Sequence, residues 1–180
     1  VRENVCFLRE FSRRRFAKAT AAACLTRDLQ TLRGGEEYGV AERGANLPGG
    51  QRQRISIARA LYSAQDIVLF DDPLSAVDFQ VGSFIFAEAM QKYLKGKTRI
   101  IVTNQTYFID KADRIIVIDN KHVQFNGTID ELRQSDIPAS QFVKTISAKK
   151  KKKAKKQKET TVPQDVLETD VAEEQRSVGN

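Results

Sequence analysis

The clearest pattern of apolar and polar positions lies in the middle of the chain, at residues 45–78. Over 52–62 the apolar residues recur at helical spacing, so one face of a helix beginning near Gly50 can pack while its arginines stay in water. A short turn leads to 66–70, where the apolar residues form a run without alternation. Such a run predicts a strand buried on both faces of a parallel sheet. A helix followed by a buried strand predicts an α/β fold.

Weaker patterns on both sides predict the remaining elements. Residues 1–32 have helical character, and Thr26 is expected to cap a second short helix that ends near Gly34 and Gly35. Beyond the central stretch we expect an amphipathic helix over 79–94 that Gly96 ends, strands over 98–103, 114–118 and 122–125, and a short helix over 129–132. Phe84 is among the residues expected on the packing face of the 79–94 helix.

Composition fits one folded domain with a tail. The chain has 180 residues, of which 41% are hydrophobic, and this is enough for one sizeable core. The net charge is +7, but from Ala148 onward there are nine basic and six acidic residues, which leaves 21 and 17 before it. The folded part therefore carries only about +4, and we expect no nucleic-acid partner.

Residues 134–180 have the composition of a disordered linker, with a lysine block from Lys149 to Lys158. The simplest interpretation is a solvated tether. A sharper hypothesis is that the lysines contact anionic lipid. A nuclear-localisation or nucleic-acid patch also fits the run, although no aromatic residues interleave it.

Other features point to few further sites. Cys6 and Cys24 lack metal spacing and are expected to be reduced thiols, and His122 is expected to be a solvated turn residue. No apolar run approaches the roughly 20 residues that span a bilayer. Because the chain starts at Val1 and Met90 is its single methionine, we expect it to be a fragment.

Candidate chemistry gathers at the two ends of the central stretch. Gly49 and Gly50 allow close approach of the backbone to an anion, and a helix that starts there directs N–H groups toward a phosphate. Asp71 and Asp72 follow the apolar strand, at the edge where open α/β sheets bind ligands. They would suit a hydrated magnesium ion on a nucleotide.

These residues resemble the motifs of ATP-binding cassette (ABC) ATPases. The sequence of this stretch is most similar to the first nucleotide-binding domain of C-subfamily (multidrug-resistance-associated) exporters. The resemblance covers about Val1 to Leu132. In order, the matches are Leu47, Pro48, Gly49, Gly50 and Gln51 with the signature motif LSGGQ, Ile67 to Asp71 with Walker B, Asp72 with the catalytic-glutamate position, Ser75 to Asp78 with the D-loop, and Asn104 with the switch-histidine position.

The resemblance implies a fold, cofactors and partners. It implies a partial P-loop NTPase (RecA-like) core with a mostly parallel sheet over 45–133, and part of the ABC helical subdomain over 1–44. ATP would lie between this chain and a second nucleotide-binding domain, with Asp71 on Mg²⁺ and with the signature facing the partner's nucleotide. Asp78 of the D-loop is implied as a further nucleotide-binding residue. Glu42 and Arg43 would contact the transmembrane domains, which places the chain at the cytosolic face of a membrane.

Three departures from the family pattern bear on activity. Asp72 is one methylene shorter than glutamate, and Asn104 lacks the imidazole of a histidine. Pro48 removes a serine hydroxyl and a backbone N–H from the signature. The chain also contains no GxxxxGK[ST] phosphate loop, so we expect it to hold ATP poorly alone. We predict a degenerate half-site within a transporter that hydrolyses ATP; the alternatives are a soluble ABC ATPase or a non-catalytic regulatory module.

Overall fold

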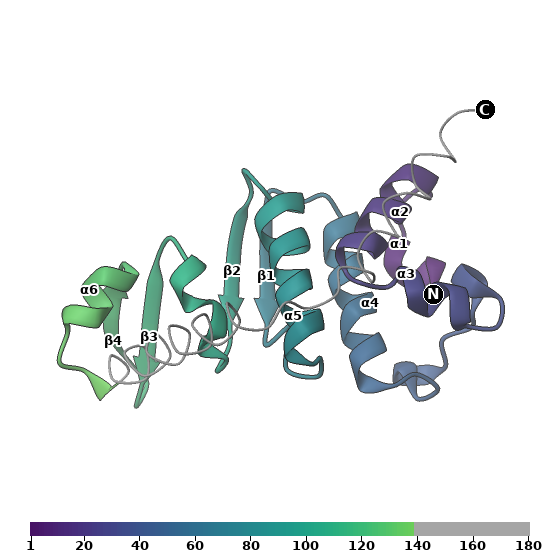
Figure 1. Ribbon diagram of the computed structural model, residues 1–180. Coiled ribbons are helices and arrows are strands. Elements are labelled where there is room, and N and C mark those ends of the chain that lie inside the picture. Colours follow the sequence, from purple (N-terminus) through teal and green to yellow (C-terminus); the bar gives the residue numbers. More distant parts are fainter. Residues whose placement is uncertain (139–180) are drawn as a thin grey trace, which may run out of the picture. The chain divides into compact units, whose positions relative to one another are not determined.

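The computed structural model describes residues 1–138 and divides the chain into two units, the first comprising residues 1–108 and the second beginning at Ile109 (Figure 1). Each unit has its own hydrophobic core. The elements before β1 are α1 (Arg2–Cys6), α2 (Arg13–Ala22), α3 (Thr26–Thr31), η1 (Gly35–Glu37), η2 (Glu42–Gly44) and α4 (Gly49–Tyr62). The elements that follow are β1 (Ile67–Asp71), α5 (Phe79–Ile85), η3 (Phe86–Tyr93), β2 (Thr98–Val102), η4 (Thr106–Lys111), β3 (Ile115–Asp119), β4 (His122–Gly127) and α6 (Ile129–Gln134).

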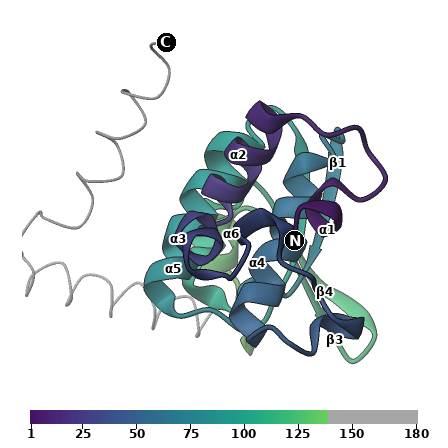
Figure 2. The same ribbon diagram turned by 90° about the vertical axis from the view of Figure 1, so that its right-hand side faces the viewer.

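Helix α4 forms where the helical spacing of apolar residues predicts it, and it packs at the centre of the first unit. It begins at Gly49, one residue before the predicted start, and its buried face packs against α1 and α2 (Figure 2). Tyr62 at its end is fully buried, and its hydroxyl donates to the Glu10 carbonyl at 2.6 Å and accepts from the Ser12 N–H at 2.8 Å. The buried residues of α4 are Ile55, Ile57, Ala58, Leu61 and Tyr62.

Strands β1 and β2 form a parallel pair, with Ile67 opposite Thr98 and Asp71 opposite Val102. Burial alternates along β1: Val68 is 5% exposed, whereas Leu69 is 70% exposed. The prediction that this strand is buried on both faces is therefore wrong. Within residues 1–138 the sheet of the first unit has two strands, and only one of its faces packs on the core.

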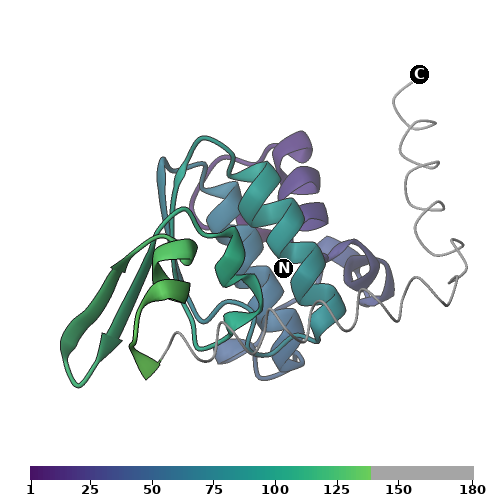
Figure 3. The same cartoon turned by 60° about the vertical axis from the view of Figure 1, so that its left-hand side comes forward.

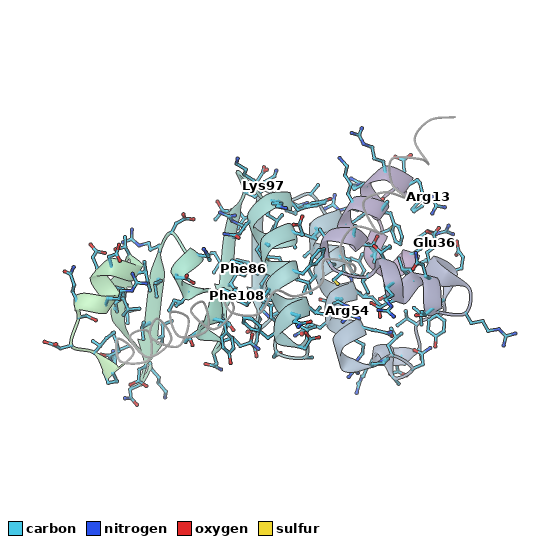
Figure 4. All side chains as sticks on the ribbon, in the orientation of Figure 1. Arg13, Glu36, Arg54, Phe86, Lys97 and Phe108 are labelled. Carbon is cyan, nitrogen blue, oxygen red and sulfur yellow. The ribbon has the colours of Figure 1, made fainter. Side chains whose placement is uncertain are left out.

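The helix predicted over 79–94 changes its winding partway. Helix α5 continues into η3, a π-helical segment, and the two form one rod (Figure 3). The Leu94 N–H donates to the Ala89 carbonyl at 3.1 Å, five residues back. Phe86 stacks on Phe108 with ring centroids 4.5 Å apart (Figure 4). Phe84 is exposed rather than packed, because the buried face of the rod is formed by Ile85, Ala89, Met90 and Leu94.

The start of α3 also differs from its prediction. Thr26 is the first helical residue, not the cap; Leu25 is the N-cap residue, and no side chain caps the helix. Leu25 is buried, so packing rather than a hydroxyl cap fixes this helix start. The helix ends at Thr31, before Gly34, which adopts a left-handed φ of 92°.

Up to residue 138, the second unit contains a hairpin and a short helix that packs on it. Strands β3 and β4 pair antiparallel through a turn at Asn120 and Lys121, both with positive φ. A capping box begins α6: the Thr128 hydroxyl accepts from the Glu131 N–H, and the Glu131 carboxylate accepts from the Thr128 N–H at 2.7 Å. That hydrogen bond is the main reason that the pKa of Glu131 is lowered. Leu132 of α6 and Ile115 of β3 form the buried core of this unit.

Some predictions lie outside the described residues. The lysine block at 149–158 and most of the predicted linker belong to residues 139–180. Among the helices of residues 1–138, none has the length and apolar character required to span a membrane.

Candidate functional site

The first turn of α4 presents unused backbone N–H groups. Pro48 is the N-cap residue, with φ −55° and ψ 149°, and no side chain caps the helix. The first N–H groups of a helix have no intrahelical partner, and together with the helix dipole they favour an anion. Leu47, immediately before, is buried in the core and anchors this turn.

The same turn is tied to α3 by polar contacts. Gln51 Nε2 donates to Asp28 Oδ1 at 2.9 Å, and Arg54 donates to Asp28 Oδ2 at 2.6 Å. The Asp28 and Arg54 side chains are only 16% and 15% exposed, so this ion pair is largely shielded from water. Gln51 Oε1 is buried and has no hydrogen-bond partner within residues 1–138. The Gln51 side chain thus faces α3.

The loop between β1 and α5, residues 72–78, packs against this turn. A Cβ added at Gly50 would lie 3.1 Å from the Ala76 carbonyl oxygen, so a larger residue there would require the loop to shift by a few tenths of an ångström. Gln53, three residues further along α4, donates from Nε2 to the Asp72 carbonyl at 2.9 Å and to Ser75 Oγ at 3.0 Å. Its Oε1 accepts from the Ala76 N–H at 2.8 Å.

The predicted carboxylates and Asn104 lie at or just beyond the ends of β1 and β2. Asp71 is exposed at the end of β1, and no side chain in residues 1–138 hydrogen-bonds to it or pairs with it. Asp72 continues the pairing, since its N–H donates to the Val102 carbonyl at 2.8 Å, and Thr103 Oγ1 donates to Asp72 Oδ1 at 3.0 Å. The backbone at Asp72 has a positive φ of 42°. Asn104 is exposed, two residues after β2 ends.

Asp78 ends the loop by capping α5. Its Oδ1 accepts from the Gln80 N–H at 2.8 Å and from the Val81 N–H at 3.0 Å. The hydrogen bond from Val81 is the largest cause of the lowered pKa of Asp78. The carboxylate therefore orders the start of α5 while it remains exposed.

Glu42 and Arg43 lie on η2, apart from the packed residues. Both side chains are 92% exposed, and their closest charged atoms are 4.0 Å apart. Arg43 has a left-handed φ of 54°. An exposed pair at this distance contributes little to stability, so both charges stay available to a partner.

The donor groups fit a magnesium nucleotide, but only in part. Residues 1–138 contain no group of three or more His, Cys, Asp or Glu side chains arranged for a metal. Asp71 offers one hard carboxylate ligand, and Mg²⁺ usually completes its shell with phosphate oxygens and water. The uncapped turn of α4 offers N–H groups to phosphate. Asp71 would hold Mg²⁺ on one nucleotide, and the α4 amides would hold phosphate of a second nucleotide.

A surface hollow of about 460 Å³ lies elsewhere, and none of the predicted site residues lines it. It surrounds the end of α1, where Phe7 and Leu8 are exposed and have positive φ. Its lining residues are Arg2, Glu3, Cys6, Phe7, Leu8, Arg9 and Phe11.

Sequence reasoning missed three residues of this region: Asp28, Gln53 and Thr103. Gln53 follows Gly50 by three positions and so shares its helix face, which is a faint signal. Asp28 and Thr103 make contacts far along the chain that no local pattern indicates.

Comparison with known proteins identifies relatives of most of the chain. A family model described as ABC transporter matches residues 1–75. ABC transporter C family member 2 of Dictyostelium discoideum is 46% identical over 145 residues, which cover 81% of this chain and 10% of the relative. C family member 6 of the same organism is 44% identical over 83% of the chain and 11% of its own length. Human ATP-binding cassette sub-family C member 2 is 42% identical over 73% of the chain and 9% of its own length. The chain thus spans about a tenth of these relatives.

Proposed function

The chain belongs to the ABC transporter family, and we propose that it forms part of an ATP-binding cassette that couples ATP binding and hydrolysis to the export of a solute across a membrane. The observation that supports this most is a juxtaposition within one unit: the uncapped turn of α4 packs against the loop that follows the carboxylates of β1. The turn offers amides to phosphate, and Asp71 offers oxygen to Mg²⁺.

Each predicted residue has a role in this proposal. Asp71 holds Mg²⁺ through water, Asp72 is the general base toward the attacking water, and Asn104 hydrogen-bonds phosphate. ATP supplies the phosphoryl group that is transferred to water. The first turn of α4 faces nucleotide held by a second cassette through its backbone N–H groups, and Asp78 is a further nucleotide-binding residue. The signature residues at this turn are Leu47, Pro48, Gly49, Gly50 and Gln51.

The proposed partners are a second nucleotide-binding domain and the transmembrane domains of the same transporter. Glu42 and Arg43 are suited to the transmembrane contact because both are exposed on a short helix and only weakly paired. The chain would then lie at the cytosolic face of the membrane. The length and names of the relatives support this proposal.

The half-site of this chain is proposed to be slow. Asp72 is shorter than glutamate, and one of its carboxylate oxygens already accepts from Thr103. A general base must lie within hydrogen-bond reach of the proton it accepts, directly or through one water. Asn104 can donate to phosphate but cannot carry the charge of an imidazolium. Nucleotide would therefore be retained here longer than at the opposite site.

Labelling with a photoreactive ATP analogue in the intact transporter tests whether this half-site binds nucleotide. We expect Mg²⁺-dependent labelling, which Asp71→Ala should weaken by about 10- to 100-fold, the range for losing an outer-shell metal partner. The matched control is Asp66→Ala, because Asp66 precedes β1 at its opposite end and pairs with Lys97. Equal labelling in both variants would contradict the role of Asp71.

The signature can be tested separately through Pro48. Pro48 provides neither a hydroxyl nor an N–H at the start of α4. If the nucleotide that it faces is the one hydrolysed, Pro48→Ser should raise the ATPase rate of the intact transporter. An unchanged rate would show that this position has little influence.

A second candidate function is a non-catalytic regulatory module. The combination of Pro48, Asp72 and Asn104, which differ from the family pattern in all three positions, favours it. The labelling experiment separates the two functions, since a module of this kind would show no specific nucleotide labelling at this half-site.

A further inference from the structure

We propose that Gln53 is a positioning residue that couples the two nucleotide sites to which this chain contributes. The inference rests on the proposed function. The first turn of α4 faces one nucleotide, and Asp71 with Asp72 faces the other. Gln53 lies between them, with its backbone in α4 and its side-chain amide on the loop of residues 72–78.

The side-chain amide of Gln53 hydrogen-bonds to the loop at two points, Asp72 and Ala76. Nε2 donates to the carbonyl of Asp72, and Oε1 accepts from the N–H of Ala76. Nε2 also donates to Ser75 Oγ, which in turn donates to the same Asp72 carbonyl at 3.0 Å. Both polar atoms of Gln53 are therefore satisfied by one loop.

The contacts also determine the orientation of the amide. In the flipped orientation Nε2 would face the Ala76 N–H, so two donors would meet, and Oε1 would face the Asp72 carbonyl, so two acceptors would meet. Only the observed orientation forms all three hydrogen bonds.

Gly50 brings the loop and α4 into a second, close contact. It lies one turn before Gln53, and an added Cβ there would lie 3.1 Å from the Ala76 carbonyl oxygen. The loop therefore contacts α4 through a backbone approach at Gly50 and through the amide of Gln53. Because close-packed contacts transmit displacement, movement of the α4 turn toward an anion shifts the Asp72 carbonyl and with it the general base.

The test measures how strongly occupancy of one site changes affinity at the other. The probe is a non-hydrolysable, photoreactive ATP analogue with Mg²⁺, titrated in the intact transporter while labelling at each site is read separately. We expect a coupling factor of about 5 or more in the wild type, and a factor within about twofold of 1 in Gln53→Met, which keeps the length of the side chain but removes the amide. Because linkage is reciprocal, nucleotide at either site must change the affinity of the other site by the same factor.

Gln105→Met is the matched control. Gln105 Nε2 donates to the Leu74 carbonyl at 3.2 Å, so it supports the same loop, but from the segment after β2 rather than from α4. We expect Gln105→Met to keep the wild-type coupling factor. An equal loss in both variants would show that general support of the loop, and not the link to α4, carries the effect, and would overturn the inference.

The outcomes separate this inference from the proposed function. If the wild type binds no analogue at either site, the proposed function fails. If both sites bind analogue but the coupling factor of Gln53→Met equals that of the wild type, only the role of Gln53 fails. Thermal unfolding of each variant detects a general loss of structure, which would lower the affinity of both sites without changing their ratio.

Discussion

The first turn of α4 and the edge formed by β1 and β2 differ in how completely their polar groups are used. In the first region, Gln51, Gln53 and Arg54 all hydrogen-bond to other elements of the chain. At the edge, Asp71 and Asn104 are exposed, and within residues 1–138 no side chain bonds to the carboxylate of Asp71. One region is held in place by the chain itself, whereas the other is open.

This difference indicates how the two regions would contribute to binding. Groups that are already positioned lose little conformational entropy when a ligand binds, while free side chains must be ordered at that moment. The α4 turn is therefore the pre-organised half of the proposed chemistry. At the carboxylate edge, Asp72 accepts from Thr103, but Asp71 has no such support and depends on a metal and on nucleotide to order it.

The largest effect is expected from the packing beneath the pre-organised region. Leu61→Ala in α4 should lower the free energy of unfolding by about 2–5 kcal/mol, because it leaves a cavity at a fully buried position. Leu69→Ala makes the same chemical change on the open face of β1, and should cost less than about 0.5 kcal/mol. Urea unfolding measures both. Similar costs would show that the face of β1 is covered in the folded protein.

A smaller effect is expected where α3 holds the α4 turn. Asp28→Ala should destabilise by about 1–3 kcal/mol, since Gln51 and Arg54 lose a shielded acceptor. Glu42→Ala, which removes an exposed acid, is the control and should change stability by less than about 0.5 kcal/mol. Arg54→Met combined with Asp28→Ala should cost less than the sum of the two single changes. Additive costs would contradict a specific pair.

The hydrophobic pattern predicted which helices and strands form better than it predicted their burial, their winding and their first residues. The spacing over 52–62 identified α4, and the apolar run identified β1. A run of four apolar residues, Ile67 to Phe70, however, does not distinguish burial on one face from burial on two, and Leu69 proved exposed. The π-helical winding of η3 and the hydrophobic start of α3 at Leu25 also leave no local signature.

The candidate site was predictable only as far as its motifs. Short-range spacing placed Asp71 and Asp72 after a strand and the diglycine at a helix start. Gln53 and Asp28 act through contacts 19 to 26 residues away in sequence, and such contacts follow from packing rather than from local pattern.

Asp78, at the end of the loop of residues 72–78, should make the stability of the protein depend on pH. The pKa of Asp78 is lowered in the folded state by the hydrogen bond from the Val81 N–H, so its contribution to stability is fully present above the unfolded pKa of about 3.9 and is lost as the pH falls through the folded value. Asp78→Ser keeps a capping oxygen but does not titrate. Thermal unfolding from pH 5 to pH 3, a range of about one unit on either side of that pKa, should show a smaller loss for this variant. Parallel losses would exclude Asp78 as a source of the acid sensitivity.

The smallest effect is expected at the open edge. Thr103→Val removes the hydroxyl that donates to Asp72 Oδ1. Because Thr103 is exposed and water can replace it, stability should fall by about 0.5 kcal/mol or less. A cost above about 1.5 kcal/mol, the upper end for an ordinary hydrogen bond, would mean that this edge is as firmly organised as the α4 turn.

The most direct test of the central claim is the ATPase rate that remains in the intact transporter when the catalytic carboxylate of the second cassette is removed. Hydrolysis would then occur only at the half-site of this chain, where Asp72 and Asn104 occupy the catalytic positions. We expect only slow residual turnover, which Asp72→Glu together with Asn104→His should raise by about tenfold or more, equivalent to about 1.4 kcal/mol of transition-state stabilisation. Near-normal turnover before those two changes would contradict that expectation.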